Sequence, residues 1–508
     1  MPYPGRRGGR IGHIQFPRSE ELALGERRQR VRNMRYQCTT DHQERSHRDG
    51  SPDICTTMRH LLHLFVAHLE PLDTAEAVVQ ALKPNLRPNE FCEQLHSIYN
   101  ETKTRLKQAL GSAHEMVLTV ELWSYRTEEP YLTVACHFVD RLGYHKSHTL
   151  ETTRCVDDPT AVNIVQQLLS IADVWGIKEK IHTLITAQMP NMKEALANTS
   201  WTHMPCFAHT LDLAIKEAMK GESAHVLLKK CRKVVRFFQS GTEAEKKLRE
   251  LQSQLRFSQK ELVQPIDDGW LCSLIMLERL DDQYQAMPIV LTQRSKKDMC
   301  LNEQELKEVK NMVLALQTFR DATSMMKSKG FETISIVIPL LKKLMGNLGK
   351  QKGMLSSGLL AQCKKHFGNP NKHKLSLTAA LDPRFKNMIL SDGDVNSLNE
   401  TLIKEQQANA RSRQMSSSVL NFEESLTMYL NHDSIPEGGD PLAWWRMTGS
   451  KIFKDLSKIA VRKLGVVSTA IPLERAFEKD EMFRNRRKCL ARENLDMILF
   501  LNSNWLEI

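Results

Sequence analysis

The stretch that decides the fold is EMVLTVELWSYRTEEPYLTVACHFVDRLGYHKSHTLETT, residues 115–153. In three runs, 115–123, 130–140 and 144–153, β-branched and aromatic residues alternate with polar residues. This two-residue period is typical of strands that bury one face. The interruptions RTEEP and DRLG contain the proline, glycine and charged residues that favour hairpin turns. The stretch therefore predicts three consecutive strands joined by two hairpins.

Helices and strands alternate after this stretch. An aspartate, Asp157 or Asp158, is the expected N-cap of a helix that has Pro159 in its first position and ends near Trp175. The elements expected next are, in chain order, a strand at 181–186, a short helix from about Asn191, a strand at 202–207 and a helix that begins at Ala208. The order β-β-β-α-β-α-β-α predicts a mixed α/β fold with an RNase H-like sheet, in residues 114–215.

Most of the remaining chain has a helical pattern. Residues 216–436 carry apolar residues at three- and four-residue steps almost throughout, which predicts a large all-helical insertion. We interpret the glutamates, lysines and arginines on these helices as solvated faces and i,i+4 ion pairs. Residues 56–113 are also expected to be helical, and a last block, 437–508, ends in the apolar run ENLDMILFLNSNW.

The excess positive charge is concentrated at the N-terminus. The formal net charge is +11, and residues 1–50 contain eleven arginines, no lysine and six acidic residues. We interpret residues 1–55 as a basic, disordered arm, because they lack periodic apolar residues. Either the arm neutralises nucleic-acid phosphates or it is a solvated tail. The arginines expected to contact DNA in the first case are Arg6, Arg7, Arg10, Arg27, Arg28, Arg30, Arg32 and Arg35.

The eleven cysteines are scattered singly, and the chain contains no Cys-x-x-Cys pair. Single, unpaired cysteines are typical of reduced thiols in a nuclear or cytosolic protein. The spacing predicts neither a metal site nor a bound cofactor. The chain also lacks a run of about 18 uncharged apolar residues, so we expect no membrane span.

Several strings in the chain resemble the hAT transposase family, in particular its BED-type zinc-finger (ZBED) relatives. The strings are PCFAHTLDLAIKEAM (205–219), DDGWLCSLIMLERL (267–280), LTAALDPRFKNM (377–388) and AIPLERAFEKDEMFRNRRKCLARENLDMILFLN (470–502), together with the strands at 118–140. The resemblance implies an RNase H-like core split by a helical insertion and completed by a C-terminal segment that mediates dimerisation. It also implies a nuclear protein with DNA or chromatin as its partner, although the Cys-x-x-Cys pair of a BED finger is missing.

Active members of the family hold divalent metals with two aspartates and a glutamate. Glu121 stands at the first of these positions, Ala187 at the second and Glu474, in LERAF, at the third. A glutamate is one methylene longer than an aspartate, and alanine has no ligand atom, whereas Mg²⁺ and Mn²⁺ require converging carboxylate oxygens. We therefore expect a protein that is not an enzyme. Residual transposase or nuclease activity is the alternative.

Other motif positions leave more than one role open. Trp270 is expected in the core rather than on a DNA base, and Cys206 and His209 are expected to pack rather than to bind a metal. Arg384 is expected to pair with an acid. The C-terminal residues expected at a homodimer interface or in the intramolecular core are Trp444, Trp445, Leu495, Ile498 and Leu499. The resemblance favours a catalytically inactive transcriptional regulator in the nucleus, and a protein-interaction module without nucleic-acid binding is the other alternative.

Overall fold

The structure of the 508-residue chain is a computed structural model. It describes residues 88–124, 130–155, 158–187, 192–256, 260–264, 269–326, 333–368, 371–386, 400, 402–404, 419–470 and 495–504. The chain divides into two compact units, Met1–Pro88 and Asn89–Ile508, and the described residues belong to the second unit except for Pro88. The arginine arm lies outside the described residues.

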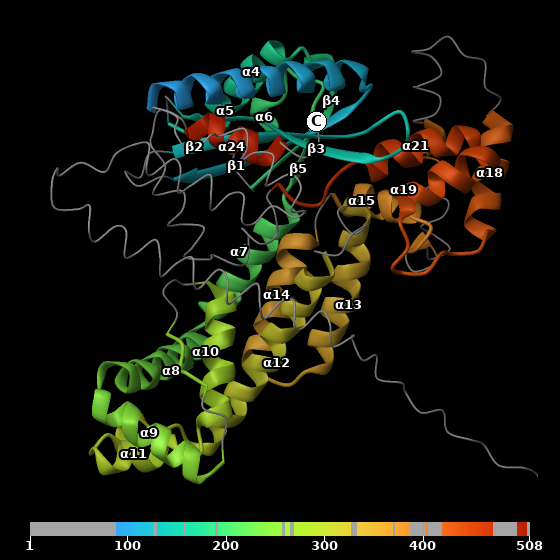
Figure 1. The fold of residues 1–508 in the computed structure, drawn as a ribbon. Helices are drawn as coiled ribbons and strands as arrows, with labels where there is room; N and C mark the ends of the chain where they lie inside the picture. The colour runs from blue at the N-terminus through green and yellow to red at the C-terminus, as the bar shows by residue number, and fades with distance from the viewer. Residues whose placement is uncertain are drawn as a thin grey trace, which may run out of the picture. The chain divides into compact units, whose positions relative to one another are not determined.

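A five-stranded mixed sheet forms the centre of the α/β part (Figure 1). The strands are β1 (Met116–Ser124), β2 (Pro130–Val139), β3 (His145–Arg154), β4 (Ile181–Thr186) and β5 (Thr202–Pro205). Their order in the sheet is β3-β2-β1-β4-β5, with the first three antiparallel and β4 and β5 parallel to β1 and β4 respectively. The three predicted strands, the element order and the mixed α/β fold class are confirmed.

The helices between the strands are α5 (Ala161–Trp175), the 3-10 turn η1 (Lys178–Lys180), α6 (Met192–Ala195) and α7 (Phe207–Met219). The predicted N-cap of α5 is wrong. Thr160 caps this helix, because its backbone is extended and its hydroxyl accepts the amide of Asn163 at 3.3 Å. Pro159 precedes this cap, and Asp158 contributes its backbone carbonyl to the Asn163 side chain instead.

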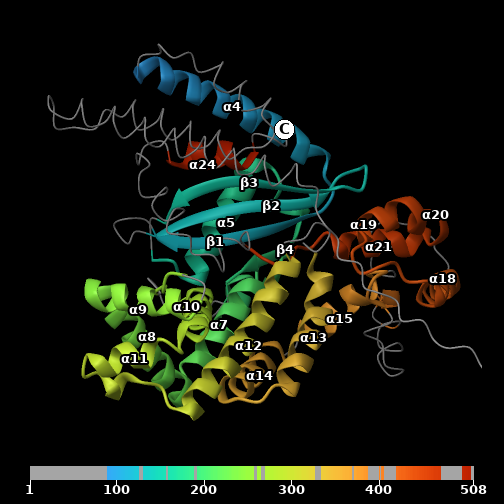
Figure 2. The same cartoon turned by 60° about the horizontal axis from the view of Figure 1, so that its bottom comes forward.

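Two helices from opposite ends of the chain cover one face of the sheet with α5. They are α4 (Pro88–Ser112) and α24 (Leu495–Asn504), which lie on the same side of the strands in Figure 2. The ring of Phe500 is 5.0 Å from that of Tyr99 and 6.2 Å from that of Trp175. The Asn504 amide donates to the carbonyl of Thr149 in β3 at 2.7 Å. The C-terminal helix therefore shares a core with the first strands.

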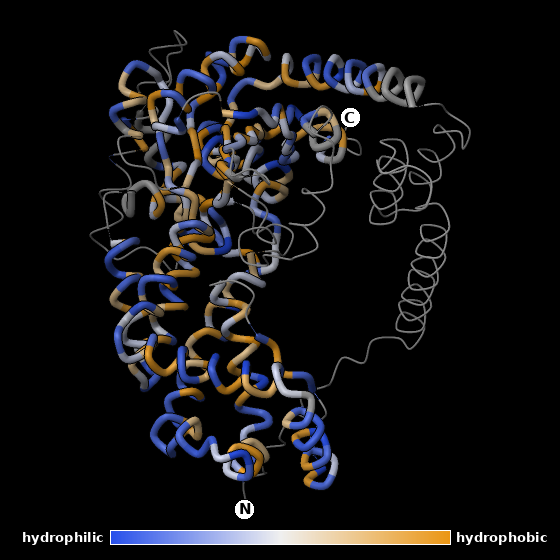
Figure 3. Tube along the Cα trace, turned by 90° about the vertical axis from the view of Figure 1, so that its left-hand side faces the viewer, coloured by the Kyte–Doolittle hydropathy of each residue, from blue (hydrophilic) through white to orange (hydrophobic). Residues whose placement is uncertain are grey.

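The opposite face continues into the helical region. Val117, Ile185 and Met204 from the sheet belong to the same apolar cluster as residues of these helices. The alternation of hydrophilic and hydrophobic turns along them is visible in Figure 3. The elements are α8 (Glu222–Ser240), α9 (Thr242–Gln254), α10 (Trp270–Gln283), α11 (Met287–Gln293), η2 (Lys297–Met299), α12 (Glu303–Met326), η3 (Ile334–Ile336), α13 (Val337–Lys350), α14 (Met354–Phe367) and α15 (Asn371–Ala380). The helix α18 (Val419–Asn431) packs instead with the last helical group.

The last helical group packs on its own aromatic core. It consists of α19 (Pro441–Trp444), the π-helical turn η4 (Trp445–Gly449), α20 (Ser450–Ile452) and α21 (Lys454–Leu464). Trp445 is fully buried and its ring lies 4.9 Å from that of Tyr429, while its indole N–H donates to the carbonyl of Leu381 at 2.9 Å. This group is therefore attached to the loop that follows α15.

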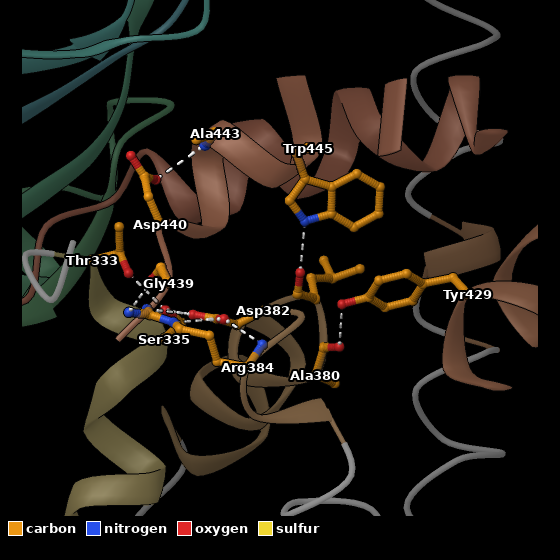
Figure 4. A network of polar contacts seen from close by, with 11 residues as sticks. Thr333, Ser335, Ala380, Asp382, Arg384, Tyr429, Gly439, Asp440, Ala443 and Trp445 are labelled. Atoms are coloured by element: carbon orange, nitrogen blue, oxygen red, sulfur yellow. Dashed lines mark hydrogen bonds and ion pairs between the residues drawn. The ribbon is translucent and has the colours of Figure 1, made fainter. Parts of the chain in front are cut away.

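That loop, LDPRFK at 381–386, joins three parts of the chain (Figure 4). Arg384 donates to both carboxylate oxygens of Asp382, at 2.9 and 2.7 Å, and both side chains are fully buried. Asp382 also accepts the hydroxyl of Ser335 in η3 at 2.7 Å, and Arg384 reaches the carbonyl of Gly439 at 3.3 Å. The predicted pairing of Arg384 with an acid is confirmed, and the pair connects η3 with the segment before α19.

No helix in the described part of the chain combines the length and the apolar character that a membrane span requires.

Candidate functional site

Strand pairing places the first two expected metal-ligand positions next to each other. β1 and β4 are parallel, with Val120 opposite Thr186. Glu121 is the next residue of β1, which continues to Ser124, and Ala187 directly follows β4 at the carboxyl-terminal edge of this strand pair. The acid in β1 and the residue after β4, which the resemblance aligned as ligand positions, therefore occupy neighbouring positions in the sheet.

Glu121 points toward the α7 side of the sheet. Alternate residues of a strand share a face, so Glu121 lies on the same face as Val117 and Thr119. Val117 belongs to the apolar cluster that includes Leu211 of α7. Glu121 is only half-buried, and its carboxylate is close enough to His209 in the first turn of α7 to influence that imidazole electrostatically.

His209, in the first turn of α7, is a further polar residue on this side of the sheet. Burial lowers the pKa of its imidazole, although the carboxylates of Glu121 and Asp212 act in the opposite direction. Its Nδ1 atom is buried and makes no hydrogen bond within the described residues. Asp212 forms an ion pair of 2.6 Å with Lys216, so its charge is largely compensated within α7. The site therefore contains a neutral imidazole beside a carboxylate.

The residues around Ala187 supply neutral groups. The hydroxyl of Thr186 donates to the carbonyl of Ala187 at 2.7 Å, and the Nε2 atom of His203 lies 3.0 Å from the same hydroxyl. Burial lowers the pKa of His203, which favours its uncharged form. A methyl group, a hydroxyl and a neutral imidazole offer no charged oxygen to a hard divalent cation.

Cys206 attaches the C-terminal segment to this edge of the sheet. Its backbone N–H donates to the carbonyl of Thr186 at 2.7 Å, and its thiol sulfur accepts the N–H of Ala470 at 3.1 Å. The amide of Phe207 donates to the carbonyl of Ser468 at 3.0 Å. These bonds bring Ala470, which precedes Glu474 by four residues, to the end of β4. Glu474 itself lies outside the described residues.

Within the described residues, the first two ligand positions do not supply the carboxylates that the implied metals require. Nowhere in the described ranges do three His, Cys, Asp or Glu side chains gather in a way that could hold an ion. Of these two positions, Glu121 supplies a carboxylate and Ala187 has no ligand atom. The packing role expected for Cys206 is confirmed by its complete burial and by its bond to Ala470.

The other residues for which the sequence predicted a role lie either in a hydrophobic core or outside the described residues. Trp270 is buried in the helical region, with its ring 6.5 Å from that of Phe319, so its predicted place in the core is confirmed. Trp445 lies in the intramolecular core, whereas Trp444 beside it is only half-buried. Leu495, Ile498 and Leu499 belong to α24, but their side chains lie outside the described set.

Comparison with known families gives three matches in chain order. Residues 119–203 match the model of the ZBED1 RNase-like domain, and residues 204–315 match the ZBED1 RNase-like helical domain. Residues 425–505 match the hAT family C-terminal dimerisation region. The chain belongs to the hAT-transposase-derived proteins. This hAT-derived chain has the RNase-like core, the helical domain and the dimerisation region of its family.

Among curated proteins, the chain is similar to zinc finger BED domain-containing proteins. It is 23% identical to human zinc finger BED domain-containing protein 4 over 462 residues, which are 80% of this chain and 39% of the relative. It is 22% identical to human zinc finger BED domain-containing protein 6 over 46% of this chain and 26% of the relative. The mouse protein 6 is 22% identical over 40% and 23% respectively. The matches therefore span less than half the length of these relatives.

The sequence did not indicate two long-range contacts, one at this site and one in the loop at 381–386. The bond from Ala470 to Cys206 crosses 264 residues of sequence, and the bond from Ser335 to Asp382 crosses 47. A buried thiol that accepts a backbone N–H has no signature in composition or periodicity. The Cys-x-x-His spacing of Cys206 and His209 indicates that Cys206 packs in the core, but it does not indicate that Ala470 is its partner.

Proposed function

We propose that this chain is a domesticated hAT transposase-like protein that has lost strand cleavage and acts as a dimeric, DNA- or chromatin-associated transcriptional regulator in the nucleus. The observation that carries the proposal is the pairing of β1 with β4, which sets Ala187 next to Glu121. Two-metal cleavage of a phosphodiester requires oxygen ligands at both positions. With an alanine at one of them, a metal pair has too few charged ligands.

The loss of chemistry is tested by a strand-cleavage assay with Mn²⁺ or Mg²⁺ on linear and hairpin DNA. The unaltered chain and the Glu474→Gln variant are expected to give the same background signal. Robust metal-dependent cleavage by the unaltered chain that disappears in Glu474→Gln would overturn the proposal in favour of residual nuclease or transposase activity.

The dimeric state is supported by the match of residues 425–505 to the hAT dimerisation region. Trp444 is half-buried: its ring packs against Tyr429 and Phe453, and its exposed part is available for a subunit contact. Trp444→Ala is expected to weaken the dimer in sedimentation velocity while the circular dichroism spectrum is retained. A monomeric unaltered chain at micromolar concentration would contradict this part of the proposal.

DNA association and nuclear location are supported by the basic arm and by the zinc-finger names of the relatives. Binding that depends on phosphate contacts weakens steeply with salt. Deletion of residues 1–50 is expected to reduce both the affinity for duplex DNA and the slope of its salt dependence. A chain that binds no DNA at low salt would instead support a protein-interaction module.

A further inference from the structure

The exposed side of α8 carries an unusual row of positive charges. Lys229, Lys233 and Arg236 are all exposed and follow each other at spacings of four and three residues, so they lie on one side of the helix. The opposite side of α8 is anchored in the core by Leu227, Cys231, Val234, Val235 and Phe238. We call Lys229, Lys233 and Arg236 the α8 basic row. It is presented on a fixed platform rather than on a mobile segment.

The row lacks acidic partners. Within the described residues, Lys229, Lys233 and Arg236 form no ion pair; Arg236 faces the neutral amide of Gln264, whose oxygen can accept from the guanidinium at 3.2 Å. The acid that approaches α8 is Glu305, and it pairs with Lys230 at 2.7 Å on the flank of the helix. In the described part of the chain, no ion pair therefore neutralises the positive charge of the row.

The next helix shows the contrast. On α9 each cation has an acidic neighbour one turn away: Lys246 pairs with Glu243 at 3.7 Å, Lys247 with Glu250 at 2.9 Å and Arg249 with Glu245 at 2.6 Å. Such pairs stabilise a solvated helix face, so α9 has the pattern that the sequence interpretation expected. On α8, Lys229 and Lys233 are instead like charges at i,i+4.

Like charges one turn apart on a helix repel each other and destabilise it slightly. The row contains two such neighbours, Lys229 with Lys233 and Lys233 with Arg236. A local feature that opposes folding without a compensating contact is characteristic of a functional surface. A polyanion laid along α8 would convert this repulsion into attraction.

We propose that the α8 basic row binds the phosphate backbone of double-stranded DNA, as a second contact independent of the N-terminal arm. The row extends about 10 Å along the helix at 1.5 Å per residue. This length matches about three phosphates of one strand at 3.4 Å each along the duplex axis. This inference rests on the proposed DNA association: the α8 basic row is the part of the folded chain that would contact the DNA.

The contact is not sequence-specific, because the three side chains offer charge and hydrogen-bond donors that suit phosphates. The row would position the helical region on a duplex, and sequence selection would have to come from another part of the protein. Lys230 and Arg232 are not part of the row, because Glu305 holds the first and the second donates to the Ser273 hydroxyl at 3.4 Å.

The test is a salt titration of the full chain on a fluorescent DNA duplex. The variant Lys229→Gln/Lys233→Gln/Arg236→Gln is expected to lower the slope of log K against log salt by about 2.7, at roughly 0.9 per phosphate contact. The matched control, Lys246→Gln/Lys247→Gln/Arg249→Gln on α9, removes the same charge from paired positions. It is expected to leave the slope nearly unchanged.

The thermal stability of the same proteins separates a binding role from a structural one. Because the α8 variant removes like-charge repulsion, its midpoint of unfolding should equal or exceed that of the unaltered chain while its DNA affinity falls. Equal slopes for the α8 variant and the α9 control would overturn the inference.

The arm deletion distinguishes this failure from that of the proposed function. If the chain without residues 1–50 binds no DNA and the α8 variant binds like the unaltered chain, the inference fails and DNA association through the arm stands. If the unaltered chain binds no duplex at low salt, both fail. Binding of polyglutamate in place of DNA, lost in the α8 variant, would assign the row to an acidic protein and overturn the DNA contact.

Discussion

The backbone N–H of Ala470 donates to the thiol of Cys206 at 3.1 Å. Cys206 also donates its own N–H to Thr186 at the end of β4, so one residue connects a central strand with the segment that leads toward Glu474. The edge of the sheet that carries Glu121 and Ala187 is thus assembled from three distant parts of the chain.

Replacing the thiol should loosen this edge locally. Cys206→Ala removes the acceptor for Ala470 and leaves a small cavity, and the loss of a buried acceptor costs about 1–3 kcal/mol. Hydrogen exchange at the amides of Ala470 and Phe207 is expected to accelerate. The matched control is Cys363→Ala, a fully buried cysteine of α14 in the same apolar cluster. Equal exchange rates at Ala470 in both variants would contradict the role of Cys206.

Restoring an acid at the second position should restore affinity for a metal. In Ala187→Asp, two carboxylates stand at neighbouring positions, one within β1 and one just after β4, and repel each other, so the melting temperature without metal is expected to fall. Mn²⁺ should raise the melting temperature again. At a Mn²⁺ concentration one hundred times Kd, the free energy of unfolding should increase by about 2.7 kcal/mol. The control is Ala187→Asn, which adds similar volume without charge. A comparable Mn²⁺ effect on the unaltered chain would show that the site already holds an ion.

Breaking the buried ion pair should be costly. Both Arg384 and Asp382 are fully buried, and removing one partner of such a pair typically costs about 3–5 kcal/mol. Arg384→Met is therefore expected to lower the midpoint of urea unfolding strongly. The control is Lys458→Met, because Lys458 forms an exposed pair with Asp455 at 3.0 Å, and exposed pairs contribute about 0–1 kcal/mol. Equal effects of the two variants would show that the network in Figure 4 does not stabilise the chain.

Acid should destabilise the sheet through two half-buried histidines, His137 and His182. The Nε2 atom of His137 lies 2.9 Å from the hydroxyl of Thr119 and its Nδ1 atom 2.8 Å from that of Ser147, with the ring of His145 stacked at 6.0 Å. Burial lowers the pKa of His137 from 6.5 to about 3, and the neighbouring histidines act in the same direction. Burial likewise lowers the pKa of His182 to about 4.

The direction of the pH effect follows from these values. A lowered pKa means that the unfolded chain binds protons that the folded chain rejects, so stability present above pH 6.5 is lost as the pH falls toward 4. At about 1.36 kcal/mol per pKa unit, His137 alone accounts for up to about 3 kcal/mol at pH 4. His137→Gln should flatten the pH dependence of urea unfolding. An unchanged slope in this variant would exclude His137 as the source.

Local patterns predicted the elements of the sheet closely. The two-residue period of 115–153 reflects burial of one strand face, and this pattern is local to the residues of each strand. The observed bounds of the strands agree with the predicted bounds within one or two residues. The cap of α5 was mispredicted because Asp158 and Thr160 are both good N-caps. Which of them serves depends on where the helical backbone begins, and composition does not determine that point.

The sequence by itself determined the alternation of strands and helices, the helical insertion and the absence of an acid at Ala187. Three relationships depend on the tertiary structure. Ala187 lies beside Glu121, the Cys206 thiol accepts the N–H of Ala470, and the Asp382 carboxylate accepts the hydroxyl of Ser335. The reason is physical: periodicity records how much of each element is buried, whereas the identity of the partner depends on how buried faces from distant parts of the chain fit together.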